Sequence, residues 1–548
     1  MIAGGLRELP ARLRRRAILE ADVRRLRREH GDAFRAHDSA SGRVALIVSL
    51  TEFVYQLKLE GLLGAALRQH GLRPLVLVQP GSWIPRKYFE SFGITDLVEL
   101  GDYLTEDMER EAEREAAKIL GGRPTFAELR GLTFRGAAIG RNVLATVSRA
   151  LHEGAVDLGE PRIRAKLAEL LPRTLAATLA AERLLDDLGP ELVLFLERNY
   201  AAEAPISEVA LVRGANVVQF ISGPRNDTLV CKRFTRETRR VHPRSLSDES
   251  WQRVQRMPWT GEHDRALDED FEHLYGSVSA PRDDLLRALG LDPGKKTAVV
   301  YSHILWDANM FYGEDLFSDQ HEWFVATLRA AAANDRVNWI VKLHPANRWK
   351  RRREGMEGPS DEEKAIREVL GKLPPHIALL QPESEISTGS IFGLTDVGIT
   401  IRGSVGYELP CFGVPVLTAG TGFYSGLGFT VDSASAADYL ARLEAVERTF
   451  PLRPEQVELA RRHAYALFRL RPMRFSSFTA ERRPLPEMGH PLDHDIELHL
   501  RTREDFESAK DLRRFAGWAT GSRELDYLEL EGVSTVPLSV LGDRPGPS

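Results

Sequence analysis

Apolar runs of strand length alternate with helical patterns along much of the chain, which predicts βαβ units around parallel sheets. The predicted strands form two series, at residues 43–50, 74–79, 192–196 and 216–221 and then at 296–302, 339–343 and 395–400. Within the first series, residues 102–187 show helical patterning and few strand signals, so we expect a helical insertion there. Residues 235–292 are charged and rich in turn signals, which predicts a connection between two sheets.

The length of 548 residues exceeds a single ordinary core and predicts at least two domains. We expect four parts: a basic N-terminal helix over 1–40, a Rossmann-like domain over 41–285, a second Rossmann-like domain over 286–475, and a crossing helix and tail over 476–548. The predicted fold class is α/β, with two Rossmann-like domains facing a central cleft and the helical insertion in the first.

The composition is that of an ordinary globular protein, and a formal net charge of −5 argues against bulk binding to nucleic acid. Cys231 and Cys411 are the only cysteines, so a disulfide framework or a cysteine zinc site is excluded and a reducing compartment is the simplest expectation. No run approaches the length of a membrane-spanning helix, and the N-terminus lacks the apolar core of a signal peptide. We therefore expect a cytoplasmic protein.

Residues 339–347 read Trp-Ile-Val-Lys-Leu-His-Pro-Ala-Asn and bring a lysine and a histidine to the end of an apolar strand. Side chains alternate along a strand, so Lys342 and His344 share one face, while Pro345 ends the strand pairing. Ligands of open α/β sheets bind outside the carboxyl edge, where an imidazole suits a phosphate group. The alternative is that His344 only hydrogen-bonds a neighbouring loop.

A glycine-rich turn follows a later strand, with Thr-Ile-Arg-Gly-Ser-Val-Gly-Tyr-Glu over residues 400–408. Gly403 allows a ligand to approach the backbone, Ser404 is a good N-cap, and the free amides of a helix start attract phosphate. Glu408 points to the same side of the helix as Ser404, which leaves its carboxylate free to bind ribose hydroxyls. A solvated helical carboxylate is the alternative. Pro410 is unexpected inside a helix, so the helix starts later than Ser404 or is kinked.

These motifs together resemble bacterial capsule-polysaccharide biosynthesis glycosyltransferases of the GT-B type, a group that includes Kdo transferases, and they are distantly similar to bacterial sialyltransferases with a His-Pro motif. The matching residues are Lys-Leu-His-Pro over 342–345, Gly403-Ser404 with Glu408, Gly-Val-Pro-Val-Leu over 413–417, and Tyr424. The resemblance covers residues 290–445 best and the first half only in general pattern. It implies that His344 contacts the donor phosphate and that Ser404 and Glu408 lie beside the nucleotide.

The function expected on this basis is metal-independent transfer of a sugar from a nucleotide-activated donor, with a CMP-linked donor favoured, to a surface polysaccharide or glycolipid. No cofactor is expected, because the nucleotide-sugar is a co-substrate. The candidate donor-binding residues are Ser302, His303, Lys342, Pro345, Arg402, Gly403, Ser404 and Glu408. His344 is expected to donate a hydrogen bond or proton to the leaving phosphate, and Glu52 and Glu197 are the candidates for the base.

Three alternatives share this fold: a nucleotide-sugar epimerase, a CDP-polyol phosphotransferase, and a non-catalytic glycan-binding scaffold. The epimerase would act on the donor without an acceptor, and the scaffold would tolerate loss of the phosphate-side residues. No group of histidines and acids shows a convincing metal-ligand spacing.

The opening helix is rich in arginine, with Arg14-Arg15-Arg16 followed by further arginines up to Arg28. A basic helix of this kind can lie on anionic lipid, so peripheral association with the inner face of the membrane is a hypothesis. The alternative is a solvated helix packed on the first domain, because Glu20, Asp22 and Glu29 dilute the positive charge.

Overall fold

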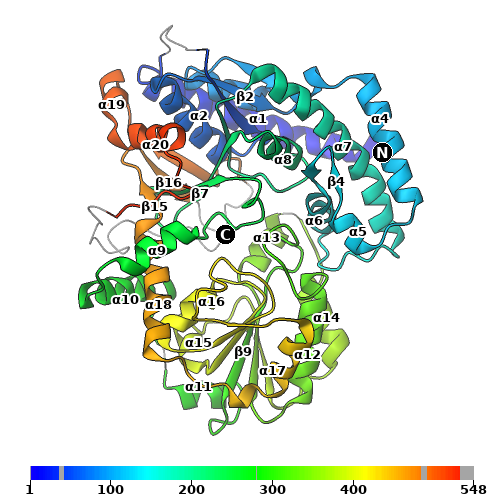
Figure 1. Cartoon of the computed structure of the whole chain (residues 1–548), viewed down its shortest axis with the longest axis vertical. Coiled ribbons are helices and arrows are strands. Elements are labelled where there is room, and N and C mark those ends of the chain that lie inside the picture. The colour runs from blue at the N-terminus through cyan, green and yellow to red at the C-terminus, as the bar shows by residue number, and fades with distance from the viewer. Residues whose placement is uncertain (1, 36–41, 279, 354, 483–489, 531–548) are drawn as a thin grey trace. The chain divides into compact units, whose positions relative to one another are not determined.

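The computed structural model describes all residues except 1, 36–41, 279, 354, 483–489 and 531–548. The chain divides into two compact α/β units (Figure 1). The first comprises Met1–Gly140, Ala168–Arg239 and Pro472–Tyr527, and the second comprises Arg141–Leu167, Arg240–Arg471 and Leu528–Ser548.

The described residues of the first unit form a seven-stranded sheet in the order β15-β8-β7-β6-β1-β2-β3. Its strands are β1 (Val44–Ser49), β2 (Arg73–Val78), β3 (Leu97–Glu99), β6 (Leu192–Phe195), β7 (Asn216–Ser222), β8 (Thr228–Phe234) and β15 (Pro472–Arg474). The strands from β3 to β7 pair in parallel, whereas β8 and β15 are antiparallel. The strand order reverses between β1 and β6, which is the Rossmann arrangement.

Helices and two short hairpins complete this part of the chain. The helices are α1 (Ile2–His30), α2 (Val54–Gln69), α3 (Trp83–Ser91), α4 (Glu106–Gly121), α5 (Phe126–Arg130), α6 (Gly140–Leu151), α7 (Pro161–Leu188), α8 (Ala204–Val212), α19 (Arg503–Ser508) and α20 (Lys510–Gly521). The short strands are β4 (Thr133–Phe134) with β5 (Ala137–Ala138), and β16 (Phe478–Arg482) with β17 (His494–Leu498). Most of α6 and the start of α7 belong to the second unit.

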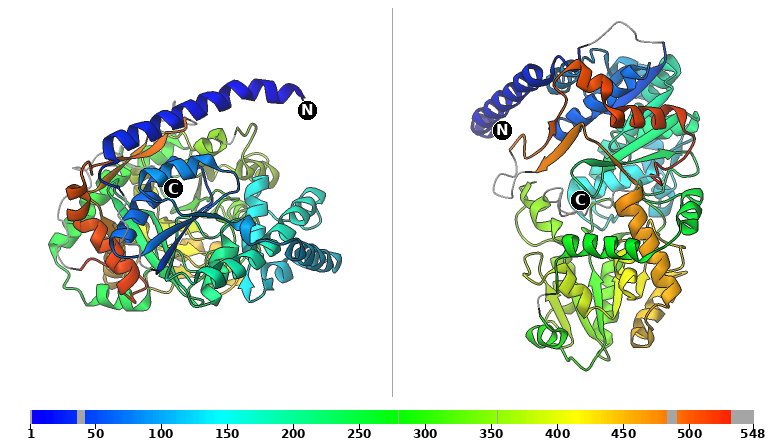
Figure 2. Two further views of the ribbon diagram at one scale, coloured as in Figure 1. Left: turned by 90° about the horizontal axis from the view of Figure 1, so that it is seen from above. Right: turned by 90° about the vertical axis from the view of Figure 1, so that its left-hand side faces the viewer.

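Helix α1 is one long helix at the edge of the first unit (Figure 2). Its inner face buries Leu19 and Val23 in the core of that unit. Asp22 of the same face is 3% exposed; it lies 2.9 Å from the Lys58 ammonium and accepts a hydrogen bond of 2.7 Å from the Tyr88 hydroxyl. The helix is therefore fixed to the unit by a buried ion pair as well as by apolar contact.

In the second unit, the described residues form a six-stranded parallel sheet in the order β11-β10-β9-β12-β13-β14. Its strands are β9 (Thr297–Tyr301), β10 (Asn338–Lys342), β11 (Ile377–Leu380), β12 (Val397–Thr400), β13 (Val416–Thr418) and β14 (Val431–Asp432). The order again reverses beside the first strand, here between β9 and β12. A ligand-binding crevice is expected outside the carboxyl ends of these two strands.

Helices cover both faces of the second sheet (Figure 1). Helices α12 (Gln320–Ala333), α14 (Asp361–Leu370) and α17 (Ala436–Glu444) pack on one face through a core that contains Trp323, Ile366 and Tyr439. Helices α11 (Arg282–Ala288), α15 (Thr388–Leu394) and α16 (Val405–Glu408) pack on the other face. The remaining helices of this unit are α9 (Asp248–Arg256), α10 (Gly261–Tyr275), α13 (Ala346–Arg353) and α18 (Pro454–Tyr465), which continues as a π-helix over Ala466–Leu470.

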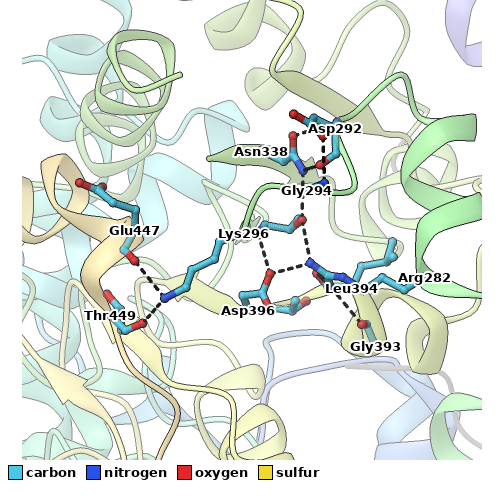
Figure 3. A network of polar contacts seen from close by, with 12 residues as sticks. Arg282, Asp292, Gly294, Lys296, Asn338, Gly393, Leu394, Asp396, Glu447 and Thr449 are labelled. Atoms are coloured by element: carbon cyan, nitrogen blue, oxygen red, sulfur yellow. Dashed lines mark hydrogen bonds and ion pairs between the residues drawn. The ribbon is translucent and has the colours of Figure 1, made fainter. Parts of the chain in front are cut away.

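A network of polar contacts joins the amino ends of three strands of the second sheet (Figure 3). Asp396 accepts hydrogen bonds from the Thr297 amide at 2.7 Å and from Arg282 at 2.6 Å. The Asn338 side chain donates to the Asp292 carbonyl at 2.7 Å. These contacts hold the three strands together at the amino edge of the sheet, which is opposite to its carboxyl ends.

The predicted α/β class with two Rossmann-like sheets is confirmed. The stretch 235–292 connects the two sheets as predicted, between β8 and β9, but it is helical rather than turn-rich, because it contains α9, α10 and α11. Charged residues hide the helical pattern, while Trp251, Val254 and Phe271 supply the buried face. The basic segment 348–353 lies in helix α13.

The bounds of the two units differ from those expected. The second unit already begins at Arg240, and it also takes Arg141–Leu167 from the predicted helical insertion. Residues 476–482 and 490–527 contribute strands and helices to the first unit, and helix α18 precedes the return of the chain to that unit at Pro472. None of the described helices combines the length and the apolar character that crossing a bilayer requires.

Candidate functional site

The reversal point of the second sheet brings two loops together. Ser302 and His303 follow β9, and Gly403 lies just after β12. The Nε2 atom of His303 is 3.4 Å from the Thr400 hydroxyl, and the Gly403 amide donates to that hydroxyl at 3.0 Å. The predicted residues of both loops therefore lie at the position where open α/β sheets bind ligands.

His344 follows the neighbouring strand β10, and its ring orientation is fixed by the backbone. Its amide donates to the Ser302 hydroxyl at 3.1 Å, which ties the ends of β9 and β10 together. The Ala346 amide donates to His344 Nδ1 at 3.1 Å. Because Nδ1 accepts a hydrogen bond, the proton of the neutral ring lies on Nε2. His344 therefore presents an N–H donor.

Burial, and secondarily Lys342, lowers the pKa of His344 to about 4, so the ring is neutral at pH 7. Burial and the neighbouring His344 likewise lower the pKa of His303 to about 3. The His344 imidazole is thus close enough to disfavour a charge on His303. Gly403 is required beside them, because a Cβ atom there would lie 2.8 Å from Thr400 Oγ1 and 3.2 Å from His303 Nε2.

Lys342 and Glu408 are two ionisable residues at this edge of the sheet whose side chains interact electrostatically. Burial lowers the pKa of Lys342, and the Glu408 carboxylate opposes this shift. Glu408 is only 5% exposed, and it accepts a hydrogen bond of 2.6 Å from the Tyr275 hydroxyl of α10. Burial raises the pKa of Glu408 although Tyr275 counteracts it. The Glu408 carboxylate is therefore engaged by Tyr275 rather than free, and its binding of ribose stays a prediction.

Ser404 does not cap a helix, contrary to the expectation. It has helical dihedral angles of −57° and −26°, and its side chain makes no capping hydrogen bond. Helix α16 ends at Glu408 and passes directly into a 3₁₀ turn, Leu409–Phe412, which accommodates Pro410. A helix of one turn offers little dipole, so the site depends on side chains rather than on a helix start.

Arg402 is engaged in structural contacts. Its guanidinium donates to the Tyr312 carbonyl and forms an ion pair with Asp315. The two side chains are 9% and 2% exposed. Arg402 thus anchors the loop 303–319, between β9 and α12, whereas Pro345 is exposed at the rim.

Three charged residues at this edge were missed as candidates. Asp307 lies in the loop after β9, and its Oδ1 is 3.2 Å from Arg149 Nη1. Its Oδ2 forms an ion pair with Lys350 of α13. Asp307 and Lys350 follow His303 and His344 closely in sequence, a signal that could have found them. Arg149 is far away in sequence and gives no local signal.

The two candidate bases lie in the first unit, just after β1 and β6, the strands at its own reversal point. Glu197 accepts hydrogen bonds from the amides of Arg198 at 2.7 Å and Asn199 at 2.8 Å, and from the Asn199 side chain at 3.1 Å. The Glu52 side chain is 39% exposed and lies 3.7 Å from Arg15. Glu197 stabilises its own turn, which leaves Glu52 as the more accessible carboxylate.

Within the part of the chain that the structure describes, no cluster of three or more His, Cys, Asp or Glu side chains is arranged to hold a metal ion.

No family model matches the chain, and no curated protein matches it by sequence. Among solved structures it is similar to KpsC of Thermosulfurimonas dismutans, a β-Kdo 2,4 transferase, at 15% identity over 58% of this chain and 88% of that chain, with a TM-score of 0.30. It is similar to UDP-GlcNAc 2-epimerase from Neisseria meningitidis at 10% identity over 77% of this chain and 97% of that one, with a TM-score of 0.25.

The calicheamicin glycosyltransferase CalG4 matches at 15% identity over 77% of this chain and 93% of that chain, with a TM-score of 0.25. At these TM-scores the similarities carry no argument about activity.

Proposed function

We propose that this chain is a glycosyltransferase that moves a sugar from a nucleotide-activated donor, with a CMP-linked sugar as the favoured class, to a hydroxyl of a surface polysaccharide or glycolipid. The observation that carries the proposal is the Nε2–H donor of His344, which lies beside Lys342 and His303 at the reversal point of the second sheet. A departing phosphate requires positive potential and oriented donors at that position.

In the proposed reaction, the bond between the anomeric carbon and the phosphate oxygen breaks while the acceptor oxygen bonds to the anomeric carbon. His344 donates a hydrogen bond from its Nε2–H to the departing phosphate, and the negative charge of that phosphate raises the pKa of the ring. Lys342 adds positive potential. The acceptor hydroxyl gives its proton to a base, and Glu52 is the better candidate because Glu197 is engaged by three N–H groups.

The donor class can be tested by the thermal stability of the purified protein with CMP, CDP, UDP, GDP and dTDP, since a ligand that binds only the folded state raises the melting temperature. We expect one nucleotide to give a clear shift, and His344→Ala to reduce it. His376→Ala is the matched control, because His376 lies just before β11 at the opposite edge of the same sheet. Absence of a shift with every nucleotide would contradict the proposal.

The epimerase alternative is separated by turnover without acceptor. A transferase leaves the sugar of the donor unchanged, whereas an epimerase converts it. Conversion of the nucleotide-sugar in the absence of any acceptor, followed by NMR of the sugar ring, would favour the epimerase. A CDP-polyol phosphotransferase would respond to CDP-linked donors and release CMP.

The proposal includes contact of α1 with anionic lipid. Leu13 on this helix is 60% exposed, and Arg14 and Arg24 are exposed on the same helix. Sedimentation with vesicles that contain phosphatidylglycerol should recover the protein, and Arg14→Glu with Arg24→Glu should reduce the bound fraction. Equal recovery with neutral phosphatidylcholine vesicles would argue against an electrostatic contact.

A further inference from the structure

Three charged side chains beside the two histidines have no part in the mechanism above. Asp307 forms ion pairs through both of its oxygens, with Arg149 at 3.2 Å on Oδ1 and with Lys350 on Oδ2. The Asp307 and Lys350 side chains are 19% and 16% exposed, while Arg149 is 46% exposed. One carboxylate therefore holds two cations, and the group of three carries a net positive charge.

Local packing places this group beside His303 and His344. The Asp307 amide donates to the Ile304 carbonyl at 3.0 Å, which turns the loop back after His303. Ile304 and Trp306 pack against Ala346 in a small buried cluster. This contact joins the loop after β9 to the start of α13, the helix that follows His344 and carries Lys350. Consistent with this placement, the Asp307 carboxylate opposes the burial that lowers the pKa of both histidines.

Arg149 reaches the same place through the segment 141–167, which lies between β3 and β6 in sequence but belongs to the second unit. The His152 ring meets Trp306 edge-on, with centroids 4.8 Å apart, and the Asn309 side chain donates to the Gly154 carbonyl at 3.0 Å. The segment is thus docked on the loop 303–319 on both sides of Asp307.

The loop is held in a strained conformation at this point. Ala308 and Met310 have φ angles of 52° and 77°, a region that residues other than glycine rarely adopt. Arg141 from the same segment donates to the carbonyls of Met310 at 3.1 Å and Gly313 at 2.8 Å. Strain of this kind persists only where the surroundings fix it, and it is concentrated at ligand sites.

We propose that Arg149 and Lys350 form an anion subsite beside His303 and His344 that binds further oxygens of the same nucleotide phosphate. Asp307 is the counter-ion that pairs with both cations and shares them with that phosphate when it binds. This inference rests on the proposed function for the identity of the ligand. A phosphate oxygen competes with the carboxylate for the same N–H donors, since both are oxyanions that accept charge-assisted hydrogen bonds.

The charges of Arg149, Lys350 and Asp307 predict that their removal changes the affinity for an anion in opposite directions. Loss of either cation weakens anion binding, whereas loss of the carboxylate strengthens it, because both cations then face the ligand without competition. A merely structural role of the three residues would weaken binding in every variant. The sign of the Asp307 effect therefore separates the two interpretations.

The test is calorimetric titration of the full chain with CMP and with inorganic pyrophosphate at low salt, after circular dichroism has shown that each variant is folded. We expect Arg149→Ala and Lys350→Gln to raise the Kd about tenfold and Arg149→Lys to restore most of the affinity. Asp307→Asn should lower the Kd at least about twofold. Arg162→Ala is the matched control, since Arg162 is on the same segment and pairs only with Glu153 and Glu160 among the contacts described for it.

The subsite is disproved if Arg149→Ala leaves the Kd unchanged, or if Asp307→Asn weakens binding as much as loss of a cation does. Should Asp307→Asn not fold, the comparison of Arg149→Ala with Arg149→Lys decides alone. If pyrophosphate binds with the expected pattern and no nucleotide does, the subsite stands and the proposed function fails. If a nucleotide binds in a manner that depends on His344 but not on these cations, only the subsite fails.

Discussion

His344 shows how a single backbone amide determines the chemistry of a side chain. Because the Ala346 amide occupies Nδ1, the neutral ring is held as the Nε2–H tautomer. We predict that NMR of the ring nitrogens at pH 7 shows this tautomer and that His344 in the free protein titrates with a pKa of about 4. Added nucleotide should raise the pKa of His344, since phosphate stabilises the charged ring. A ring that is already cationic at pH 7 without ligand would contradict this assignment.

The burial of Glu60 predicts a pH dependence of protein stability that is independent of the candidate functional site. Its side chain is fully buried in α2, accepts a hydrogen bond of 2.7 Å from Gln56, and has its pKa raised to about 8 by burial. The folded state therefore keeps the Glu60 carboxyl protonated above its ordinary pKa of 4.5. The stability of the folded state that depends on this protonated carboxyl is fully present below pH 4.5 and is lost as the pH rises towards 8.

Glu60→Gln removes this titration, and its stability relative to the natural chain should increase by up to about 1.4 kcal/mol per pH unit between pH 5 and 8. Urea unfolding at several pH values measures the difference, with the exposed Glu504→Gln as control. Parallel stability curves for Glu60→Gln and the natural chain would show that Glu60 is ionised in the folded state.

At the scale of elements, the turn after β12 depends on close packing rather than on a helix start. A Cβ atom at Gly406 would lie 1.9 Å from Cζ of Tyr424, whose hydroxyl donates to the Gly403 carbonyl at 2.8 Å. Gly406→Ala must displace this buried ring, so we expect destabilisation of about 1–3 kcal/mol and weaker nucleotide binding. Thermal unfolding is the measurement. Gly121→Ala is the control, because no atom lies within 4 Å of a Cβ there and the helix should gain stability.

Strand β8 illustrates an element that depends on a distant partner. Lys232 lies in the sheet with 1% of its side chain exposed, and it pairs at 2.6 Å with Asp526, which is fully buried. Lys232→Met alone leaves a buried carboxylate without its cation and should destabilise the first unit by about 3–5 kcal/mol. Lys232→Met with Asp526→Leu should recover most of this loss. Urea unfolding measures the destabilisation of both variants. Equal destabilisation in the single and double variants would show that Lys232 and Asp526 are not energetically coupled.

At the scale of the whole molecule, the chain leaves the first unit and returns to it near the end. Residues after Arg471 supply β15 at the sheet edge and many core side chains, among them Phe475, Ile496 and Phe515. A chain that ends at Arg471 should therefore lose the cooperative unfolding of the first unit while the second unit keeps its own transition. Differential scanning calorimetry measures both. Retention of every transition by the shortened chain would contradict this view of the core.

The amino-acid sequence alone determined the α/β class, most of the central strands and the place of Lys342, His344 and Gly403 at a sheet edge. These features follow from local periodicity, because a buried parallel strand is apolar along its length and a ligand edge carries polar residues directly after it. Local patterning also placed His303 and the glycine-rich turn in loops that follow strands of the second predicted domain.

Only the tertiary structure decided which charges are engaged and which remain for a ligand. Glu408 is held by Tyr275, Arg402 by Asp315, and Arg149 is brought to Asp307 across 158 residues of sequence. Strands such as β8 were missed for the same reason, since their charges are compensated by partners far along the chain. Burial and ion pairing depend on distance in space, which local sequence does not encode.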